Sequence, residues 1–130
     1  MLRCVRAPEP RYLEEPRGLF RAGGGIVVLP RRTEEVAAIL RLCHAGRVAV
    51  VPYGGGTGLV GGQIAGPDLV PVILSLERMA AVRGLWPDEN VMIVEAGAIL
   101  ADVQRAAEAA GRVFPLSLAS QGSCRIGGNL

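Results

Sequence analysis

The sequence predicts an α/β (α+β) protein built from two small β-α-β units, the second of which is incomplete. Three observations predict this class. Short continuous apolar runs are typical of strands buried on both faces. Two stretches with helical apolar spacing stand beside such runs. Clusters of glycine follow the strands, at 54–62 and 127–128. With 130 residues, the chain is long enough for one domain at most.

The first unit is expected to follow a polar lead-in, residues 1–21, which prolines interrupt. The apolar run at 26–29 predicts a strand. Thr33 is the expected N-cap of a helix with acidic residues in its first turn, where they complement the helix dipole. The apolar spacing of this helix ends at Cys43, and Gly46 is its expected stop.

Two further strands complete the first unit. The run at 48–51 predicts a strand parallel to the first, since a β-α-β connection brings strands into parallel, right-handed arrangement. The run at 69–74 predicts another strand. Pro71 lies inside it and cannot donate a ladder hydrogen bond, which favours the edge of the sheet for this strand.

The second unit begins with a strand expected at 91–95. A helix is expected at 98–110, because apolar residues recur on one side of it and Gly111 follows as a stop. Val113 and Phe114 then lead into a loop at 115–128. The pattern of the second unit is therefore β-α-β followed by a loop, with the apolar pair Val113 and Phe114 in the place of its last strand.

Composition excludes several function classes. The chain has 14 basic and 12 acidic residues, for a net charge of +2, and none of the basic residues is lysine. Scattered arginines and 4% aromatic residues argue against nucleic-acid binding. A phosphate-binding P-loop and a Schiff base both need a lysine, so neither chemistry belongs to this chain.

The cysteine pattern favours a reducing compartment. Three cysteines without a C-x-x-C pair suit neither a disulfide scaffold nor a zinc site. We find no apolar core of a signal peptide near the N-terminus. The uncharged stretch at 48–67 contains glycines and prolines, which makes a membrane span a poor interpretation. These features predict a cytoplasmic protein without a membrane span or a metal site.

The glycine-rich segment at 54–62 is the main candidate for a binding site. It follows a predicted buried strand, and glycine lets the backbone approach a ligand closely. Successive backbone N–H groups can form a concave anion site, in which a hydrogen bond to a charged group contributes roughly 1.5–3 kcal/mol. Several such bonds, with the Thr57 hydroxyl, could hold a diphosphate without a lysine.

This segment has two other interpretations. Residues 56–61 match the dinucleotide fingerprint G-x-G-x-x-G, with Glu77 as the acidic residue after the next strand. That fingerprint must open a helix, and glycines and Pro67 leave no room for one, so the match is accidental. A plain flexible loop is the other alternative, although linkers favour serine and charge as well as glycine.

The second loop, 115–129, combines glycines with hydroxyls, an amide and Arg125. Alone it indicates little. Together with the first loop, it predicts that a large ligand is held from both units, with backbone amides supplied by both loops. Arg125 is as easily a surface residue as a partner for a phosphate.

Residues 51–62 and 114–129 resemble two motifs of a known family. The sequence is similar to the N-terminal FAD-binding domain of FAD-linked oxidases of the vanillyl-alcohol-oxidase/p-cresol-methylhydroxylase (PCMH) type. Within these it resembles the D-2-hydroxyacid dehydrogenase branch, with the glycolate oxidase flavin subunit, D-lactate dehydrogenase and D-2-hydroxyglutarate dehydrogenase. The resemblance extends over about residues 11–130 and implies a FAD-binding domain at 22–130 after the lead-in.

The resemblance implies a role for each matching residue. The first loop would wrap the FAD diphosphate and let the chain pass close to the cofactor, and the second would line the flavin and ribityl side. The implied residues of the first loop are Pro52, Gly54, Gly55, Gly56, Thr57, Gly58, Leu59, Gly61 and Gly62. Those of the second loop are Pro115, Leu116, Ser120, Gly122, Ser123, Ile126, Gly127, Gly128 and Asn129.

Two departures from the family refine these expectations. Members with covalent flavin often have a histidine in the first loop, and 54–62 contains none, so non-covalent FAD is expected. The family's substrate domain lies beyond residue 130, so we expect a truncated chain without catalytic residues. The family function would be oxidation of a small 2-hydroxy acid to the 2-oxo acid. A non-catalytic nucleotide-binding module and an inactive fragment remain alternatives.

Overall fold

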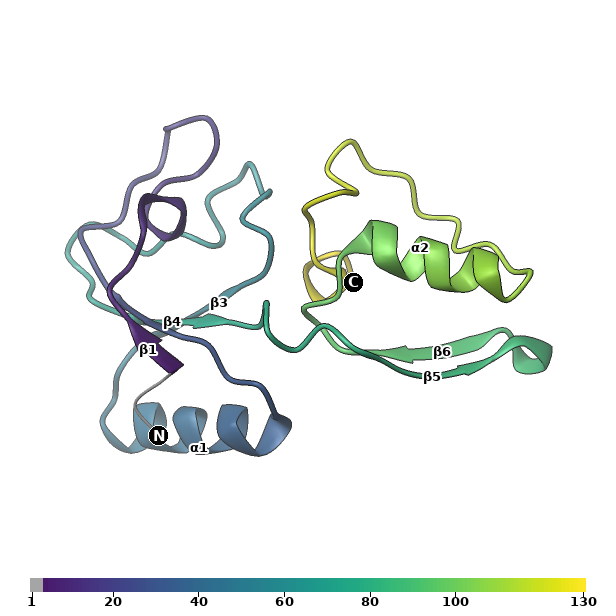
Figure 1. The fold of residues 1–130 in the computed structure, drawn as a ribbon. Coiled ribbons are helices and arrows are strands. Elements are labelled where there is room, and N and C mark those ends of the chain that lie inside the picture. Colours follow the sequence, from purple (N-terminus) through teal and green to yellow (C-terminus); the bar gives the residue numbers. More distant parts are fainter. Residues whose placement is uncertain (1–3) are drawn as a thin grey trace.

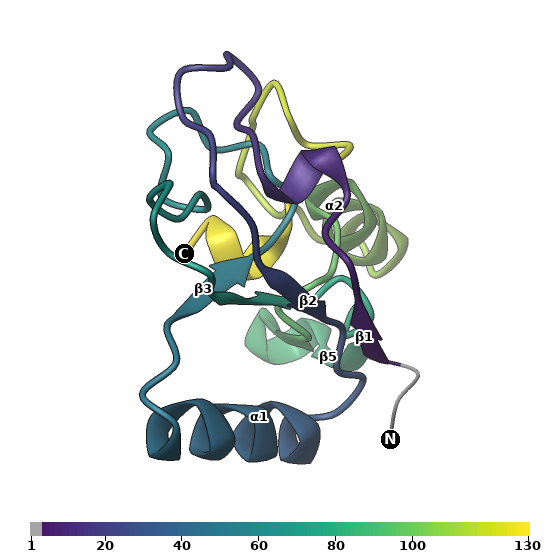
Figure 2. The ribbon, with the colours of Figure 1, turned by 90° about the vertical axis from the view of Figure 1, so that its left-hand side faces the viewer.

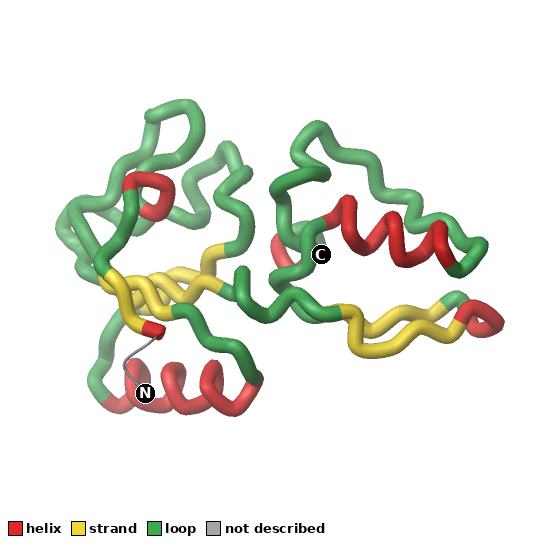
Figure 3. The backbone as a smooth tube through the Cα atoms, viewed as in Figure 1, coloured by secondary structure: helices red, strands yellow, loops and turns green. Residues whose placement is uncertain are grey.

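The computed structural model describes residues 4–130 and consists of two α/β units joined by the segment around residues 76–81 (Figure 1). Each unit contains one sheet and one long helix, and loops make up much of the rest (Figure 3). The expected mixed α/β class with two units is confirmed.

The sheet of the first unit has four strands in the order β1-β2-β4-β3. Strand β1 (Val5–Arg6) runs antiparallel to β2 (Ile26–Val28). Strand β4 (Val72–Ser75) is parallel to both β2 and β3 (Val50–Tyr53). The expected parallel arrangement of β2 and β3 is confirmed, but β4 lies between them.

The expected edge position of the Pro71 strand is wrong. Pro71 comes immediately before β4, which is a central strand paired on both sides. Because the proline stands outside the strand, its missing N–H removes no ladder hydrogen bond. Its carbonyl still accepts a hydrogen bond from the Ile26 N–H at 3.0 Å. The edge strand β3 is the one that contains a proline, Pro52.

Helix α1 (Thr33–Ala45) lies along one face of this sheet (Figure 2). Its N-cap is Arg32 rather than Thr33, and Arg32 makes no side-chain capping hydrogen bond. Instead, the Glu35 carboxylate accepts a hydrogen bond from the Arg31 N–H at 2.7 Å. The left-handed residue after the helix is Arg47, with φ of 51°, and not the expected Gly46.

The lead-in contributes to the core of the first unit. A 3-10 helix, η2 (Pro10–Tyr12), places Tyr12 against Val27, Leu29 and Tyr53. The Tyr12 and Tyr53 rings lie 4.6 Å apart, and the Tyr53 hydroxyl donates a hydrogen bond to the Arg11 carbonyl at 2.7 Å. The last residue of β3 is thereby fixed just before the first glycine-rich loop begins.

The second unit consists of a hairpin and a helix. Strands β5 (Val82–Trp86) and β6 (Val91–Val94) are antiparallel, and the 3-10 helix η3 (Pro87–Glu89) joins them. Helix α2 (Leu100–Ala109) follows and lies alongside the hairpin (Figure 1). A short 3-10 helix, η4 (Ile126–Gly128), ends the second loop.

Two details of this unit differ from the sequence prediction. Strand β5 was not expected; its register shifts between Val82 and Gly84, which interrupts its alternating pattern. No strand forms at Val113 and Phe114 within the described chain, so the unit is β-β-α rather than β-α-β. The expected helix and its stop are confirmed, since Gly111 has φ of 68° just after α2.

The core of the second unit joins α2 to the second loop. Leu100 and Val103 of the helix pack with Ala98, Cys124 and Ile126, and all five are at most 3% exposed. Alternate residues of the second loop, Cys124 and Ile126, therefore anchor it against α2. This anchoring determines where the residues between and after them lie.

Glu95 supplies a pH-dependent contribution to the stability of this unit. Its carboxylate accepts hydrogen bonds from the Ala81 N–H at 2.9 Å and from Arg83 at 2.7 Å. The Ala81 N–H and then Arg83 lower the pKa of Glu95. This stabilisation is complete above the unfolded-state pKa of about 4.3 and is lost as the pH falls through the lower folded-state value.

We therefore expect Glu95→Gln to weaken the pH dependence of stability below about pH 4.3. Urea unfolding midpoints measured from pH 7 to pH 3 should fall less steeply for this variant than for the wild type. The exposed Glu108 on α2 offers a control, since Glu108→Gln should leave the profile unchanged. Identical profiles for Glu95→Gln and the wild type would contradict the assignment.

None of the helices in residues 4–130 has the length and apolar character needed to cross a membrane. The same described residues contain no cluster of three or more His, Cys, Asp or Glu side chains placed to hold a metal ion.

Candidate functional site

The two glycine-bearing loops touch each other. A Cβ atom placed on Gly55 would lie 2.2 Å from the Ser123 carbonyl oxygen and 2.9 Å from the Cys124 Cα. A Cβ on Gly54 would meet the Arg125 side chain at 3.5 Å. The first loop thus leaves β3 and lies against the second, at the junction between the two units (Figure 1). The expectation that the loops come together is confirmed.

Glycine is required at two points of the first loop for conformational reasons. Gly56 has φ of 69°, and a Cβ there would lie 2.0 Å from the Tyr53 hydroxyl oxygen. Gly61 has φ of 76° and lies against the Phe20 ring. Side chains rarely adopt such φ values, so the loop can follow this path only with glycine at both positions.

The first loop leaves its amides free. Within the described chain, no backbone N–H from Gly54 to Gln63 donates a hydrogen bond. The loop is held instead through its carbonyls: Gln63 Nε2 donates to the Gly58 oxygen at 2.8 Å, and Arg17 donates to the Leu59 oxygen. A run of free amides on a constrained loop is the donor set of an anion site.

The second loop does not offer its amides in the same way. The N–H groups of Ile126 and Gly127 donate to the Ala98 and Ala96 oxygens, each at 2.9 Å, and those of Gly128 and Asn129 close the turns of η4. The expectation that both loops supply free amides is therefore wrong for this stretch. The segment at 96–98 accepts two of these donors and the 3-10 turn uses the other two, so the second loop contributes the side chains of Arg125 and Asn129 instead.

A cavity of about 250 Å³ lies between the loops. Its volume is below the range of roughly 300–1,000 Å³ typical of pockets that enclose a whole drug-sized ligand, so it suits a diphosphate rather than an entire dinucleotide. Its lining contains these residues expected from the sequence: Pro52, Gly54, Gly55, Gly56, Thr57, Gly58, Gly62, Gly128 and Asn129.

The other expected residues lie outside this cavity. Ile126 is buried in the core of the second unit, and Gly61 packs on Phe20. The remaining residues outside the lining are Leu59, Pro115, Leu116, Ser120, Gly122, Ser123 and Gly127. Among these, Ser120 shapes the second loop, since its carbonyl accepts the N–H groups of Ser123 and Cys124, each at 2.8 Å.

Two lining residues, Gln63 and Arg125, were not among the expected site residues. Gln63 directly follows the double glycine at 61–62, and Arg125 is the one cation of the second loop. The position of Gln63 after the two glycines and the charge of Arg125 were the only signals in the sequence that could have indicated a site residue. Neither signal shows that the side chain faces the cavity, because that depends on contacts between distant segments.

The structure also rules out the dinucleotide fingerprint at 56–61. No helix follows it: residues 57–71 form bends and turns. Glu77, the acidic residue that would bind a ribose in that fingerprint, forms an ion pair with Arg11 at 3.0 Å. The rejection of that motif on sequence grounds is confirmed.

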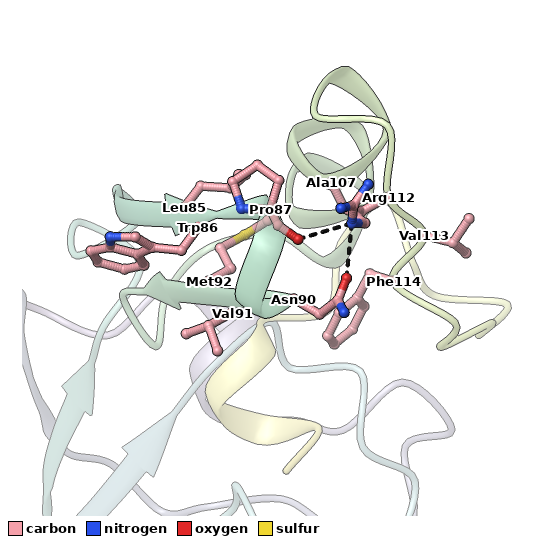
Figure 4. A pocket seen from close by; sticks show the side chains of 10 residues that line it. All are labelled: Leu85, Trp86, Pro87, Asn90, Val91, Met92, Ala107, Arg112, Val113 and Phe114. Carbon is pink, nitrogen blue, oxygen red and sulfur yellow. Dashed lines mark hydrogen bonds between the residues drawn. The ribbon is translucent and has the colours of Figure 1, made fainter.

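A larger pocket of about 560 Å³ lies elsewhere, between the β5–β6 hairpin and α2 (Figure 4). It is lined mainly by apolar groups such as Trp86, Met92 and Phe114. Its polar side chains satisfy each other, since Arg112 Nε donates to Asn90 Oδ1 at 2.8 Å and to the Pro87 oxygen at 3.0 Å. It contains no residue of the glycine loops.

Comparison with known proteins identifies a family that matches most of the chain. The family model for an FAD binding domain matches residues 25–130. D-2-hydroxyglutarate dehydrogenase from Bos taurus, a mitochondrial protein by its name, is 38% identical over 126 residues, covering 94% of this chain and 23% of that protein. D-2-hydroxyglutarate dehydrogenase from Xanthomonas citri is 42% identical over 104 residues, covering 80% and 22%. The chain thus spans less than a quarter of these relatives' length.

Solved structures share the fold. An alkyldihydroxyacetonephosphate synthase superposes with a TM-score of 0.84 at 20% identity, covering 98% of this chain and 26% of that one. A cholesterol oxidase from Brevibacterium sterolicum superposes with a TM-score of 0.71 at 17% identity, covering 95% and 23%. Because the family model covers both glycine loops and nearly all of the two units, the chain belongs to the FAD-binding-domain family.

Proposed function

We propose that this chain is the FAD-binding portion of a flavin-dependent oxidoreductase that oxidises a D-2-hydroxy acid to the 2-oxo acid. The observation that carries the proposal is the run of free amides from Gly54 to Gln63, most of whose residues line a cavity that residues of the second loop also line. The names of the 38–42% identical relatives support the substrate class. These matches also favour an oxidoreductase over a non-catalytic nucleotide-binding module.

The residues present fit the diphosphate of FAD. A cavity wall of backbone amides, the Thr57 side chain and Arg125 presents donors and positive charge and no carboxylate. Among the glycines that line it, Gly62 and Gly128 have open space where a Cβ would stand. The second-loop residues outside the cavity, from Pro115 to Gly127, are proposed to flank the flavin and ribityl side. With no histidine at 54–62, we propose that the cofactor is held non-covalently.

FAD, when bound, supplies the two-electron acceptor for oxidation of the hydroxyl-bearing carbon. The chain's own part is to bind and orient the cofactor. We assign no substrate base or catalytic residue to residues 1–130. The 2-hydroxy acid is proposed to bind through a further region of a longer protein. We also propose a cytoplasmic location and a division into a lead-in, 1–21, and the FAD-binding domain, 22–130.

The proposal is tested by titrating the chain with FAD and following the flavin fluorescence. Saturable binding is expected, with a dissociation constant on the order of 10 µM, and inorganic pyrophosphate should compete for the same site. Acid precipitation should release the flavin into the supernatant, because no covalent bond is formed. A chain that is folded by circular dichroism but shows no saturable FAD binding would contradict the proposal.

Gln63 is expected to hold the first loop in its binding conformation. Its Nε2 donates to the Gly58 oxygen at 2.8 Å, and a leucine cannot replace that bond. Gln63→Leu should therefore weaken FAD binding by roughly 5- to 10-fold, as loss of a hydrogen bond of about 1 kcal/mol implies. The melting temperature should stay nearly unchanged, because the side chain lies outside both cores.

A matched control is available in the second unit. Arg112 Nε makes a similar bond, to Asn90 Oδ1 at 2.8 Å, and Arg112 lies outside both the cavity lining and the second loop. Arg112→Leu should leave the FAD affinity within about twofold of wild type. An equal loss of affinity in both variants would show that Gln63 has no special role in the loop.

A further inference from the structure

Arg125 stands out among the residues of the cavity. It alone is charged among the described residues that form the lining. It comes from the second loop, yet its Cβ and Cγ atoms lie over Gly54 of the first loop, at 3.5 and 3.7 Å from the position of a Cβ there. The side chain therefore crosses the contact between the loops.

The backbone determines which way this side chain faces. Arg125 is extended, with φ of −106° and ψ of 140°, and forms an antiparallel bridge with Ile99. Its neighbours Cys124 and Ile126 are 2% and 3% exposed in the core of the second unit. Because successive side chains of an extended segment point to opposite sides, Arg125 faces away from that core and toward the cavity.

The guanidinium is only partly satisfied. Its Nη1 donates to the Gly97 carbonyl at 2.7 Å, while its Nε is buried without a hydrogen-bond partner in the described chain. It takes part in none of the ion pairs found among residues 4–130. The buried Nε is out of a ligand's reach, but Nη2 makes no hydrogen bond in the described chain and pairs with no carboxylate, so the guanidinium retains donors for an anion.

We propose that Arg125 is the cation that recognises a phosphate of the bound FAD. It would thereby make the site selective for the dinucleotide over a flavin without phosphate. The inference rests on the proposed function and deepens it. In a chain without lysine, the anchor to Gly97 holds the guanidinium at the cavity and leaves its remaining donors for the phosphate. Arginine suits this task because its donors lie in a fixed plane and it stays charged.

The test compares four proteins: the wild type, Arg125→Gln, Arg125→Lys and the control Arg105→Gln. Arg105 is exposed on α2 and pairs with Asp102, far from the lining. FAD and riboflavin affinities are measured by fluorescence at several salt concentrations, and inorganic pyrophosphate is used as a competitor. Melting temperatures are recorded without ligand.

We expect Arg125→Gln to weaken FAD and pyrophosphate binding by roughly 10- to 100-fold. The salt dependence of FAD binding should also become shallower, while riboflavin binding stays unchanged. Arg125→Lys should recover part of the FAD affinity and its salt dependence, because the charge is kept. Arg105→Gln should match the wild type in all measurements.

Three outcomes would overturn the inference. The first is wild-type affinity for FAD in Arg125→Gln, which leaves the proposed function standing. The second is an equal loss of FAD and riboflavin binding in both Arg125 variants, because that result would show that Arg125 has a purely structural role. If Arg125→Gln does not fold, the same comparison is made with Arg125→Lys alone. The third is the absence of FAD binding by the folded wild type, in which case the proposed function fails as well.

Discussion

Gly55→Ala is expected to lower the affinity for FAD by at least about 100-fold. The added Cβ would lie 2.2 Å from the Ser123 carbonyl oxygen and 2.9 Å from the Cys124 Cα. Both neighbours are backbone atoms, and Cys124 is buried at 2% exposure, so the second loop cannot yield locally. The first loop must move away, which opens the cavity and separates its amides from Arg125. Fluorescence titration with FAD measures the effect.

The matched control is Gly66→Ala. Gly66 follows the glycine-rich segment at 54–62, lies outside the cavity lining and has nothing within 4 Å of an added Cβ. Its backbone φ does not fall in the left-handed range. FAD affinity within about twofold of wild type is expected for this variant. If Gly55→Ala also retained wild-type affinity, the contact between the loops would not be needed for binding.

Gly97→Ala is expected to destabilise the whole chain. Gly97 lies between β6 and α2, where a Cβ would fall 1.9 Å from the Leu76 carbonyl oxygen and 2.7 Å from the Met79 carbonyl oxygen. Its N–H also donates to Met79 at 2.8 Å. The substitution therefore forces apart the segments that join the two units. Overpacking of this kind costs about 3 kcal/mol, or roughly 10 °C in melting temperature for a chain of this size.

Thermal unfolding followed by circular dichroism measures this loss. Gly24→Ala serves as the control, because nothing lies within 4 Å of an added Cβ there. That variant should melt within about 2 °C of the wild type. A melting temperature for Gly97→Ala as high as that of the control would mean that the junction adapts without cost.

Local patterns in the sequence were sufficient for most of the secondary structure. The apolar run at 91–95 and the helical spacing after it predicted β6 and α2, and Gly111 marked the end of that helix. Strand β5 was missed because Gly84 and a register shift break its alternation. The turn after α1 was also predicted incorrectly, because Arg47 rather than Gly46 takes the left-handed conformation.

The order of strands could not be derived from those patterns. Pro71 suggested an edge strand, yet β4 is central. A proline at the boundary of a strand and one inside it look alike in a sequence, but only the second removes a ladder hydrogen bond. Pairing partners are decided by which apolar faces can be buried together, and that involves residues far apart in the chain.

The sequence by itself determined the two glycine loops, their resemblance to an FAD-binding family and the absence of any lysine for a phosphate. Tertiary structure alone decided that the loops touch, that the free amides belong to the first loop and that Arg125 faces the cavity. The physical reason is that a donor is free only when no distant carbonyl accepts it. That condition is fixed by the packing of both units, which no local pattern of residues contains.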